Sequence, residues 1–176
     1  MIEAGDPAPC FSLLAAGSGR RVSLRSVQGR KAVLIFHLQG TAPTARDINR
    51  AVRERYPSPE DVLVASVVDL SLVPPVYWLS VSLVLNTAYD TAAAELPPGT
   101  NAADYVVILP DWADLVSRKY GARDTGRAAV VFVIDEDSFI TAAYRRENPV
   151  KVVLRALESK PSSVSNDSSD LSDAAN

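Results

Sequence analysis

The sequence has little of the side-chain chemistry that most redox enzymes and metal proteins use. Its 176 residues include one cysteine, Cys10, and one histidine, His37. A single cysteine cannot close a disulfide within the chain, and one cysteine with one histidine cannot supply the ligands of a structural zinc site. We therefore expect no internal disulfide, no metal and no cofactor.

The sequence also lacks a surplus of positive charge. It has 18 lysines and arginines against 21 aspartates and glutamates, a formal net charge of −3. Proteins that bind nucleic acid gain affinity by neutralising phosphates, which requires a basic surface. The arginines between residues 46 and 55 alternate with Asp47 and Glu54, a pattern typical of a solvated helix face. Nucleic acid is excluded as an expected partner.

No hydrophobic run is long enough to cross a bilayer. The most apolar stretch, residues 72–85, is shorter than the roughly 20 residues that a span requires and contains two prolines and two serines. Residues 1–6 show no basic segment followed by an apolar one, as a secretory signal would. The sequence predicts a soluble, cytoplasmic protein without a membrane span.

What the sequence does contain fits one globular domain followed by a tail. Hydrophobic residues make up 47% of the chain and charged residues 22%, both close to globular averages. We expect residues 1–159 to fold as a single domain. Residues 160–176 are rich in serine and aspartate, and such a segment is too polar to offset its ordering entropy. The sequence predicts a disordered tail there.

Apolar runs of strand length alternate with helical patterns. Strands are predicted at 32–36, 61–68, 105–109, 130–134 and 139–143, and helices at 44–56, 114–120 and 149–158. Two shorter strands, at 10–14 and 21–24, flank a glycine-rich turn and predict an amino-terminal hairpin. The pattern indicates an α/β protein with a central mixed β-sheet flanked by helices and an amino-terminal β-hairpin extension.

One further predicted helix, residues 74–96, is apolar on nearly every side. Such a helix is either deeply buried or paired with another surface. Its aromatic pair, Tyr77 and Trp78, is more often core in such a setting, and an oligomer interface that includes Leu85 is the alternative.

Several landmarks resemble the thioredoxin-like superfamily, and within it the alkyl hydroperoxide reductase and thiol-specific antioxidant branch of peroxiredoxins and redoxins. Residues 5–13 (GDPAPCFSL) are similar to the family opening Gly-x-x-Ala-Pro-Asp-Phe-x-Leu, with Cys10 in place of the aspartate. Residues 22–24, 29–36, 119–121 and 132–135 match later landmarks in the family's order. The resemblance spans residues 3–158 and implies a thioredoxin-like fold with thiol-dependent redox activity.

The sequence departs from this family where the chemistry should be. Thioredoxin-like reductases carry Cys-x-x-Cys at the start of the helix after the first buried strand, where the helix dipole lowers the thiol pKa. Peroxiredoxins place a threonine and a reactive cysteine there, which an ungapped reading aligns with Ala42 and Ala45. A methyl group cannot attack a peroxide or a disulfide. The catalytic positions are degenerate.

A third family feature is also absent. Where family members have a cis-proline or an arginine facing the thiol, this chain has Ala129, and Arg127 lies two positions out of register. Deliberate inactivation would remove cysteines but leave this residue, so natural loss is the favoured explanation.

The remaining candidates each carry two interpretations. Cys10 is either a small buried structural residue, the favoured interpretation, or a redox or intermolecular thiol. His37 either lines a vestigial pocket or transfers protons. Thr41, Thr44 and Arg46 surround the same helix start, whose amides could bind a small anion. We use the name vestigial pocket for His37, Thr41, Thr44, Arg46 and Arg127.

Two functions follow. The favoured one is a redox-inactive thioredoxin-fold binding or assembly module that has a protein partner or associates with itself. The alternative is a thiol-dependent oxidoreductase, either a peroxiredoxin or a thiol-disulfide reductase, whose cysteines were replaced in this chain or which acts through Cys10.

Overall fold

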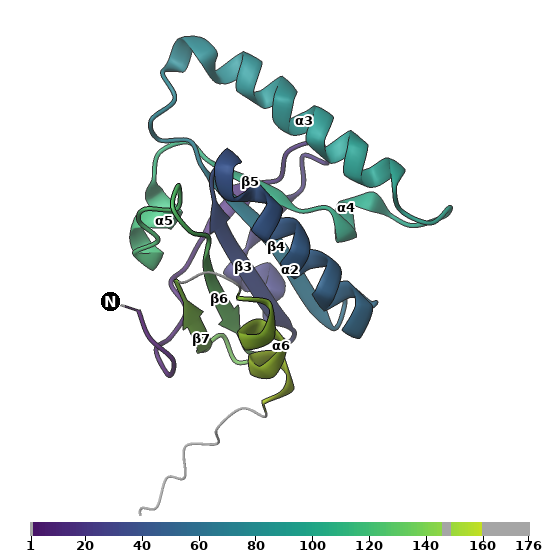
Figure 1. Ribbon diagram of the computed structural model, residues 1–176, viewed down its shortest axis with the longest axis vertical. Helices are drawn as coiled ribbons and strands as arrows, with labels where there is room; N and C mark the ends of the chain where they lie inside the picture. Colours follow the sequence, from purple (N-terminus) through teal and green to yellow (C-terminus); the bar gives the residue numbers. More distant parts are fainter. Residues whose placement is uncertain (1, 146–148, 160–176) are drawn as a thin grey trace, which may run out of the picture.

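The computed structural model describes residues 2–145 and 149–159, and its centre is a five-stranded sheet in the order β5-β4-β3-β6-β7. The strands are β3 (Lys31–His37), β4 (Val62–Asp69), β5 (Ile108–Asp111), β6 (Val130–Ile134) and β7 (Ile140–Tyr144). β3, β4 and β5 are parallel, whereas β6 and β7 are antiparallel to their neighbours (Figure 1). The predicted mixed sheet is confirmed.

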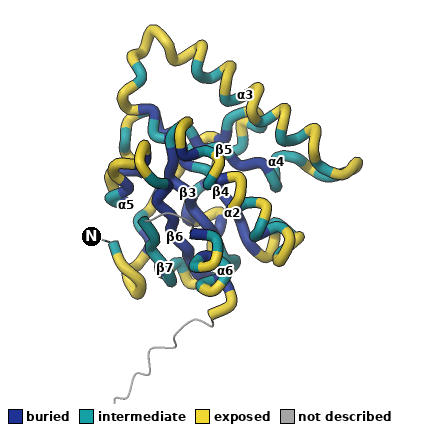
Figure 2. The backbone as a smooth tube through the Cα atoms, in the orientation of Figure 1, coloured by how far each residue is buried: buried dark blue, intermediate teal, exposed yellow. Residues whose placement is uncertain are grey.

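Helices and a hairpin cover the two faces of this sheet, which is why its central strands are apolar throughout. One face packs against α2 (Ala42–Arg55) and α6 (Val150–Glu158) through Val33 and Ile35. The other face packs against α1 (Leu24–Val27), α5 (Leu115–Tyr120) and the amino-terminal hairpin. Residues 32–36 of β3 are accordingly 0% exposed, and Figure 2 shows the buried strands between exposed helices.

An aromatic cluster fills the face opposite α2. The ring of Phe132 lies 5.7 Å from that of Phe36 and 5.1 Å from that of Tyr120, centroid to centroid, and both pairs are edge-on. Phe11 of the amino-terminal segment contacts Tyr120 at 6.3 Å. Burial raises the pKa of the Tyr120 phenol, whose hydroxyl donates to the Pro9 carbonyl at 2.9 Å. The amino-terminal segment is thereby fixed to the core.

The predicted amino-terminal hairpin is present as β1 (Ser12–Leu14) and β2 (Arg21–Ser23). Ser23 ends β2 and begins α1 with a reciprocal capping box, in which the Ser23 and Ser26 hydroxyls each accept the other residue's backbone N–H. The predicted helix after β5 is also confirmed. Buried Asp111 accepts three backbone N–H groups at its start, and Gly121, at φ +60°, ends it.

A segment between β4 and β5 lies outside this layered arrangement. It consists of η2 (Pro75–Tyr77), α3 (Trp78–Ala94) and α4 (Ala102–Tyr105). We call it the insertion. In Figure 1, α3 crosses above the sheet at a distance from α2 and α6. None of the residues of α3 is buried, so the deeply buried alternative for this helix is wrong.

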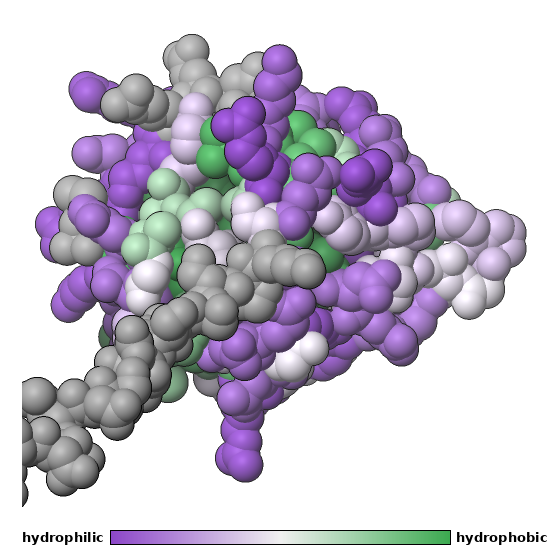
Figure 3. Space-filling model, turned by 90° about the horizontal axis from the view of Figure 1, so that it is seen from below, coloured by the Kyte–Doolittle hydropathy of each residue, from purple (hydrophilic) through white to green (hydrophobic). Residues whose placement is uncertain are grey.

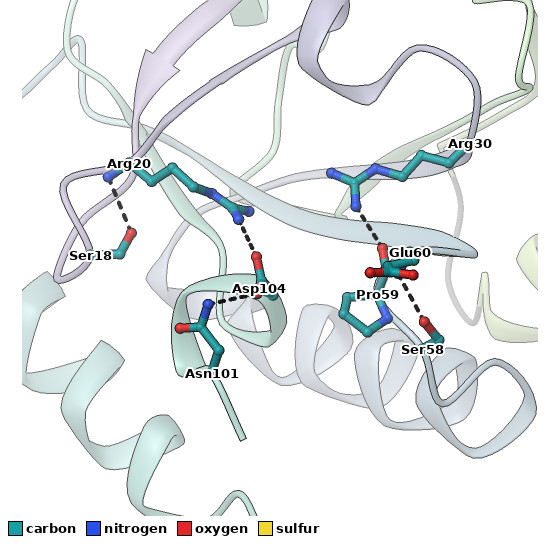
Figure 4. Close-up of polar contacts among 8 residues, drawn as sticks. All are labelled: Ser18, Arg20, Arg30, Ser58, Pro59, Glu60, Asn101 and Asp104. Atoms are coloured by element: carbon teal, nitrogen blue, oxygen red, sulfur yellow. Dashed lines mark hydrogen bonds and ion pairs between the residues drawn. The ribbon is translucent and has the colours of Figure 1, made fainter. Parts of the chain in front are cut away.

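The insertion is attached to the body at a few points. The Gly17 N–H donates to the Asn86 side chain at 2.8 Å, and Arg20 pairs with Asp104 (Figure 4). The Trp78 ring lies 5.3 Å from that of Trp112. These contacts hold α3 against the hairpin and the loop after β5, and α4 against the hairpin.

The predicted strand 105–109 is wrong at its start, because Tyr105 still belongs to α4 and β5 begins at Ile108. Asn101 and Asp104 form a local turn, with the Asp104 N–H bonded to the Asn101 carbonyl and the two side chains bonded to each other. Such side-chain bonds favour a turn over an extended chain. Across residues 2–145 and 149–159, no helix has both the length and the apolarity that a bilayer span needs.

Candidate functional site

The start of α2 is where the family resemblance places catalysis, and the fold puts it at the edge of the sheet where β3 ends. His37 is the last residue of β3, η1 (Gln39–Thr41) makes a tight turn, and Ala42 is the first residue of α2. Pro43 follows in the first turn, where a missing N–H has no cost. The local sequence therefore builds the strand, loop and helix start that thiol chemistry would use.

Ala42 and Ala45 occupy the first turn of α2, three residues apart. Ala42 is half-buried, and Ala45 is 4% exposed in a cluster with Val33 and Ile48. The spacing is that of a Cys-x-x-Cys pair at a helix start, but both side chains are methyl groups. Ala129, the third position that the resemblance marks, is buried in the same cluster. None of these three positions carries a thiol.

The Thr41 side chain holds the β3–α2 loop in place through hydrogen bonds. It is buried, its hydroxyl donates to the Thr125 carbonyl at 2.7 Å, and it accepts the Leu38 N–H at 3.0 Å. The bond to Thr125 ties the β3–α2 loop to the loop before β6. The hydroxyl has a structural role here, which leaves it little capacity for a ligand.

His37 is buried at the end of β3. It is 8% exposed, and Val130, which follows Ala129, pairs with the neighbouring Phe36. Its Nδ1 lies 3.1 Å from the Leu38 carbonyl, so the neutral ring donates there, while Nε2 is buried and has no partner among the described residues. Burial lowers the pKa of His37, against a smaller opposite effect of the Leu38 bond. The ring is neutral near pH 7.

The other residues of the vestigial pocket do not converge on His37. Thr44 is half-buried, and Arg46 and Arg127 are exposed. Within the described chain, neither guanidinium forms a hydrogen bond or an ion pair. The structure therefore places His37, Thr41 and the first turn of α2 in succession where β3 ends, and leaves Arg46 and Arg127 in solvent.

Cys10 lies on the face of the sheet opposite α2. Its backbone carbonyl accepts from Lys119 Nζ at 3.0 Å, at the end of α5, and the adjacent Phe11 packs in the core cluster opposite α2. The thiol itself is exposed. The expectation of a buried structural cysteine is wrong, because Ala8 and Phe11 take the inward positions of this extended segment.

The proposed interface residues differ in how far they are exposed. Tyr77 is 57% and Trp78 is 42% exposed, which corrects the expectation that this pair is core. Trp78 nevertheless uses its Nε1–H, which donates to the Val73 carbonyl at 3.0 Å. Leu85 is half-buried and lines a shallow hollow with Leu14 of the hairpin. It therefore faces the body.

Sequence reasoning did not single out the apolar residues of η2 and α3 that face solvent. Val76, Leu79, Leu83 and Val84 are 79%, 75%, 60% and 66% exposed. Their apolarity was visible, but no signal in an evenly apolar helix distinguishes the outward side from the inward side.

Comparison with solved structures identifies the fold as thioredoxin-like. The exposed lipoprotein thioredoxin of Streptococcus pneumoniae is 15% identical at a TM-score of 0.60, covering 85% of this chain and 98% of that one. A putative thiol:disulfide interchange protein DsbE of Chlorobium tepidum is 18% identical at 0.58, covering 89% and 99%. A putative protein disulfide isomerase of Bacteroides thetaiotaomicron is 17% identical at 0.58, covering 88% and 88%. No family model matches the sequence, and a comparison with curated proteins finds no significant match.

Proposed function

We propose that this chain is a redox-inactive thioredoxin-fold protein that acts by binding or assembly. The observation that carries the proposal is the start of α2, where Ala42 and Ala45 stand at the positions that thiol chemistry would need. A fold can persist without its original chemistry, because function resides in the site and not in the scaffold. The intact loop, with its buried Thr41 bond, is consistent with a scaffold retained for another purpose.

The alternative, an oxidoreductase that acts through Cys10, has one supporting observation, the exposure of this thiol. Cys10 lies on the sheet face opposite α2, so it cannot use the dipole of that helix. His37, on the α2 side at the end of β3, offers no base near it. Exposure alone gives a thiol that can react slowly, without the groups that would accelerate the reaction.

Membership of the peroxiredoxin and redoxin branch is part of the proposal and rests on sequence. Its support is the opening at residues 5–13 and the order of the later landmarks. The solved structures named above are a thioredoxin, an interchange protein and an isomerase, and likenesses at such low identity extend to the fold alone. The cytoplasmic location also stays a prediction.

The test compares wild type, Cys10→Ser, and Ala42→Cys/Ala45→Cys in the Cys10→Ser background. Disulfide reduction and peroxide turnover would be measured with a dithiol reductant. We expect background rates for the first two proteins. The third restores two thiols three residues apart at a helix start, where a thiolate is stabilised, and is expected to reduce disulfides well above background.

This third protein shows that the assay can detect activity on this scaffold. Turnover by wild type that disappears in Cys10→Ser would overturn the proposal and establish the oxidoreductase alternative. Background rates in wild type beside activity in the restored variant would support it, because only the sulfur atoms differ.

A further inference from the structure

One side of α3 presents a continuous apolar surface that nothing in the described chain covers. We call it the α3 outer face and define it by Val76, Leu79, Leu83 and Val84, which are 60–79% exposed. These residues follow helical spacing and lie on one side of η2 and the first half of α3. Leu72, at 92% exposed, precedes them.

The other side of the helix already has its partner. Leu85 and Asn86 lie in the hollow beside the hairpin, and Trp78 contacts Trp112. The α3 helix is therefore apolar on two sides, and one of them packs against the body of the fold. Figure 3 gives a contrast, since hydrophilic residues dominate the face opposite the insertion.

The exposed surface amounts to a large share of the apolar area that a standard-size interface buries. A large apolar side chain offers on the order of 100 Å², so the α3 outer face with Leu72 and Tyr77 leaves roughly 400 Å² of apolar surface in solvent. A standard interface buries about 800 Å² per partner, of which about 65% is apolar in homodimers. One copy of this surface supplies most of that apolar area.

The charge pattern favours a second copy over a lipid surface. Residues 74–96 contain no lysine or arginine, and their only charges are Asp90 and Glu95, in the last part of the segment. Helices that lie on anionic membranes carry basic residues on the polar side. Two copies paired antiparallel about a two-fold axis would instead join their uncharged turns and keep Asp90 and Glu95 at opposite ends.

The segment 160–176 of the same chain is a poor match for this surface. Its large apolar residues are Val164 and Leu171, among many serines and aspartates. Two separated apolar side chains cannot cover the four residues of the α3 outer face together with Leu72 and Tyr77.

We propose that the α3 outer face binds the same face of a second copy of this chain, forming a two-fold homodimer. This inference deepens the proposed function by naming the occupant of one binding surface, and it rests on that function. Leu79 and Leu83 lie in the middle of the contact. Trp78 and Leu85 support it from the inner side, where they hold α3 on the body.

Sedimentation equilibrium of the full chain up to about 100 µM tests the proposal, with wild type, Leu79→Glu/Leu83→Glu, and Phe139→Glu as the matched control. Phe139 is 45% exposed in the turn between β6 and β7, at the sheet edge where β3 begins, whereas α3 follows the edge where β3 ends. We expect wild type and Phe139→Glu to dimerise. The double variant should raise the dimer Kd by at least about thirtyfold.

Circular dichroism checks that the double variant is folded. A second measurement, disulfide cross-linking, does not use the double variant. Ser80 lies between the leucines, so Ser80→Cys in the Cys10→Ser background should form an intermolecular disulfide on mild oxidation, whereas Asp137→Cys in that background should not. A monomeric wild type, or a dimer unchanged by the double variant, overturns the proposal. So does binding of monomers to phosphatidylcholine–phosphatidylglycerol vesicles. The redox assay is independent of all these outcomes, so failure of the dimer leaves the proposed function to its own test.

Discussion

The sheet core and the insertion are both apolar, yet they differ in whether the fold covers them. Residues 32–36 of β3 are 0% exposed because helices and the hairpin close both faces of the sheet. In α3, none of the residues is buried, although residues 78–85 are apolar apart from Ser80 and Ser82. Apolar composition therefore indicates a surface to be covered, and the arrangement of elements decides whether the same chain covers it.

The largest expected difference between the regions comes from truncating one residue in each. Phe132 is fully buried against Phe36 and Tyr120, so Phe132→Ala should cost about 3–5 kcal/mol of unfolding free energy. Leu79 is 75% exposed, so Leu79→Ala in the monomer should change it by less than about 0.5 kcal/mol. Denaturant titration at low protein concentration measures both. Equal costs for the two variants would show that α3 belongs to the core.

A second comparison probes how the insertion is attached. Gly17 has φ +73°, and a Cβ there would lie 2.2 Å from the Tyr89 ring of α3. Gly17→Ala should displace α3 from the hairpin and cost about 1–3 kcal/mol, which includes the strain of a left-handed residue. Hydrogen exchange should rise in α3 and stay slow in β3.

The control for this change is Gly19→Ala. Gly19 has a similar φ of +66°, and a Cβ there meets nothing within 4 Å. Gly19→Ala should therefore introduce the backbone strain without a collision with the Tyr89 ring. Equal exchange in α3 for both variants would mean that the Tyr89 contact does not hold the helix.

The smallest expected effect is a pH dependence of folding stability that arises from the sheet core. Burial lowers the pKa of His37 in the folded chain, whereas the unfolded chain keeps a value of about 6.5. Between the two values the unfolded chain binds more protons, so stability rises with pH there and falls as the pH drops below about 6.5. The Tm of wild type at about pH 5 and about pH 8, compared with His37→Leu, measures this contribution. A wild-type difference that the variant retains in full would assign it to other groups.

Much of the fold could be predicted because local and long-range signals agree. The apolar run at 130–134 is β6, the run at 61–68 is β4 within a residue at each end, and the helix ended by Gly121 is α5. The strand–helix–strand order predicts that β3 and β4 are parallel, as they are. The errors fall where side chains form local bonds or where burial depends on distant elements, as at Asn101 with Asp104 and in α3.

The candidate site could be located from the sequence but not interpreted in detail. The family landmarks lead to Ala42 and Ala45, and the structure puts both at the start of α2. The role of Thr41 depends on the Thr125 carbonyl, 84 residues away, and the unpartnered Nε2 of His37 depends on packing from several elements. Residue spacing along the chain carries no information on either. The same holds for Cys10, whose exposure follows from which neighbours turn inward.

The contact between Trp78 and Trp112 gives the molecule an optical reporter of its own. These are the only two tryptophans in the chain, one on α3 and one after β5, with ring centroids 5.3 Å apart and planes at 45°. The aromatic cluster of the core is built from phenylalanine and tyrosine, so excitation at the red edge of the absorption band selects the two tryptophans. Exciton coupling between the two indoles should appear in the near-ultraviolet circular dichroism spectrum and vanish when α3 leaves the body. Spectroscopy of the unlabelled protein can thus follow the insertion separately from the sheet.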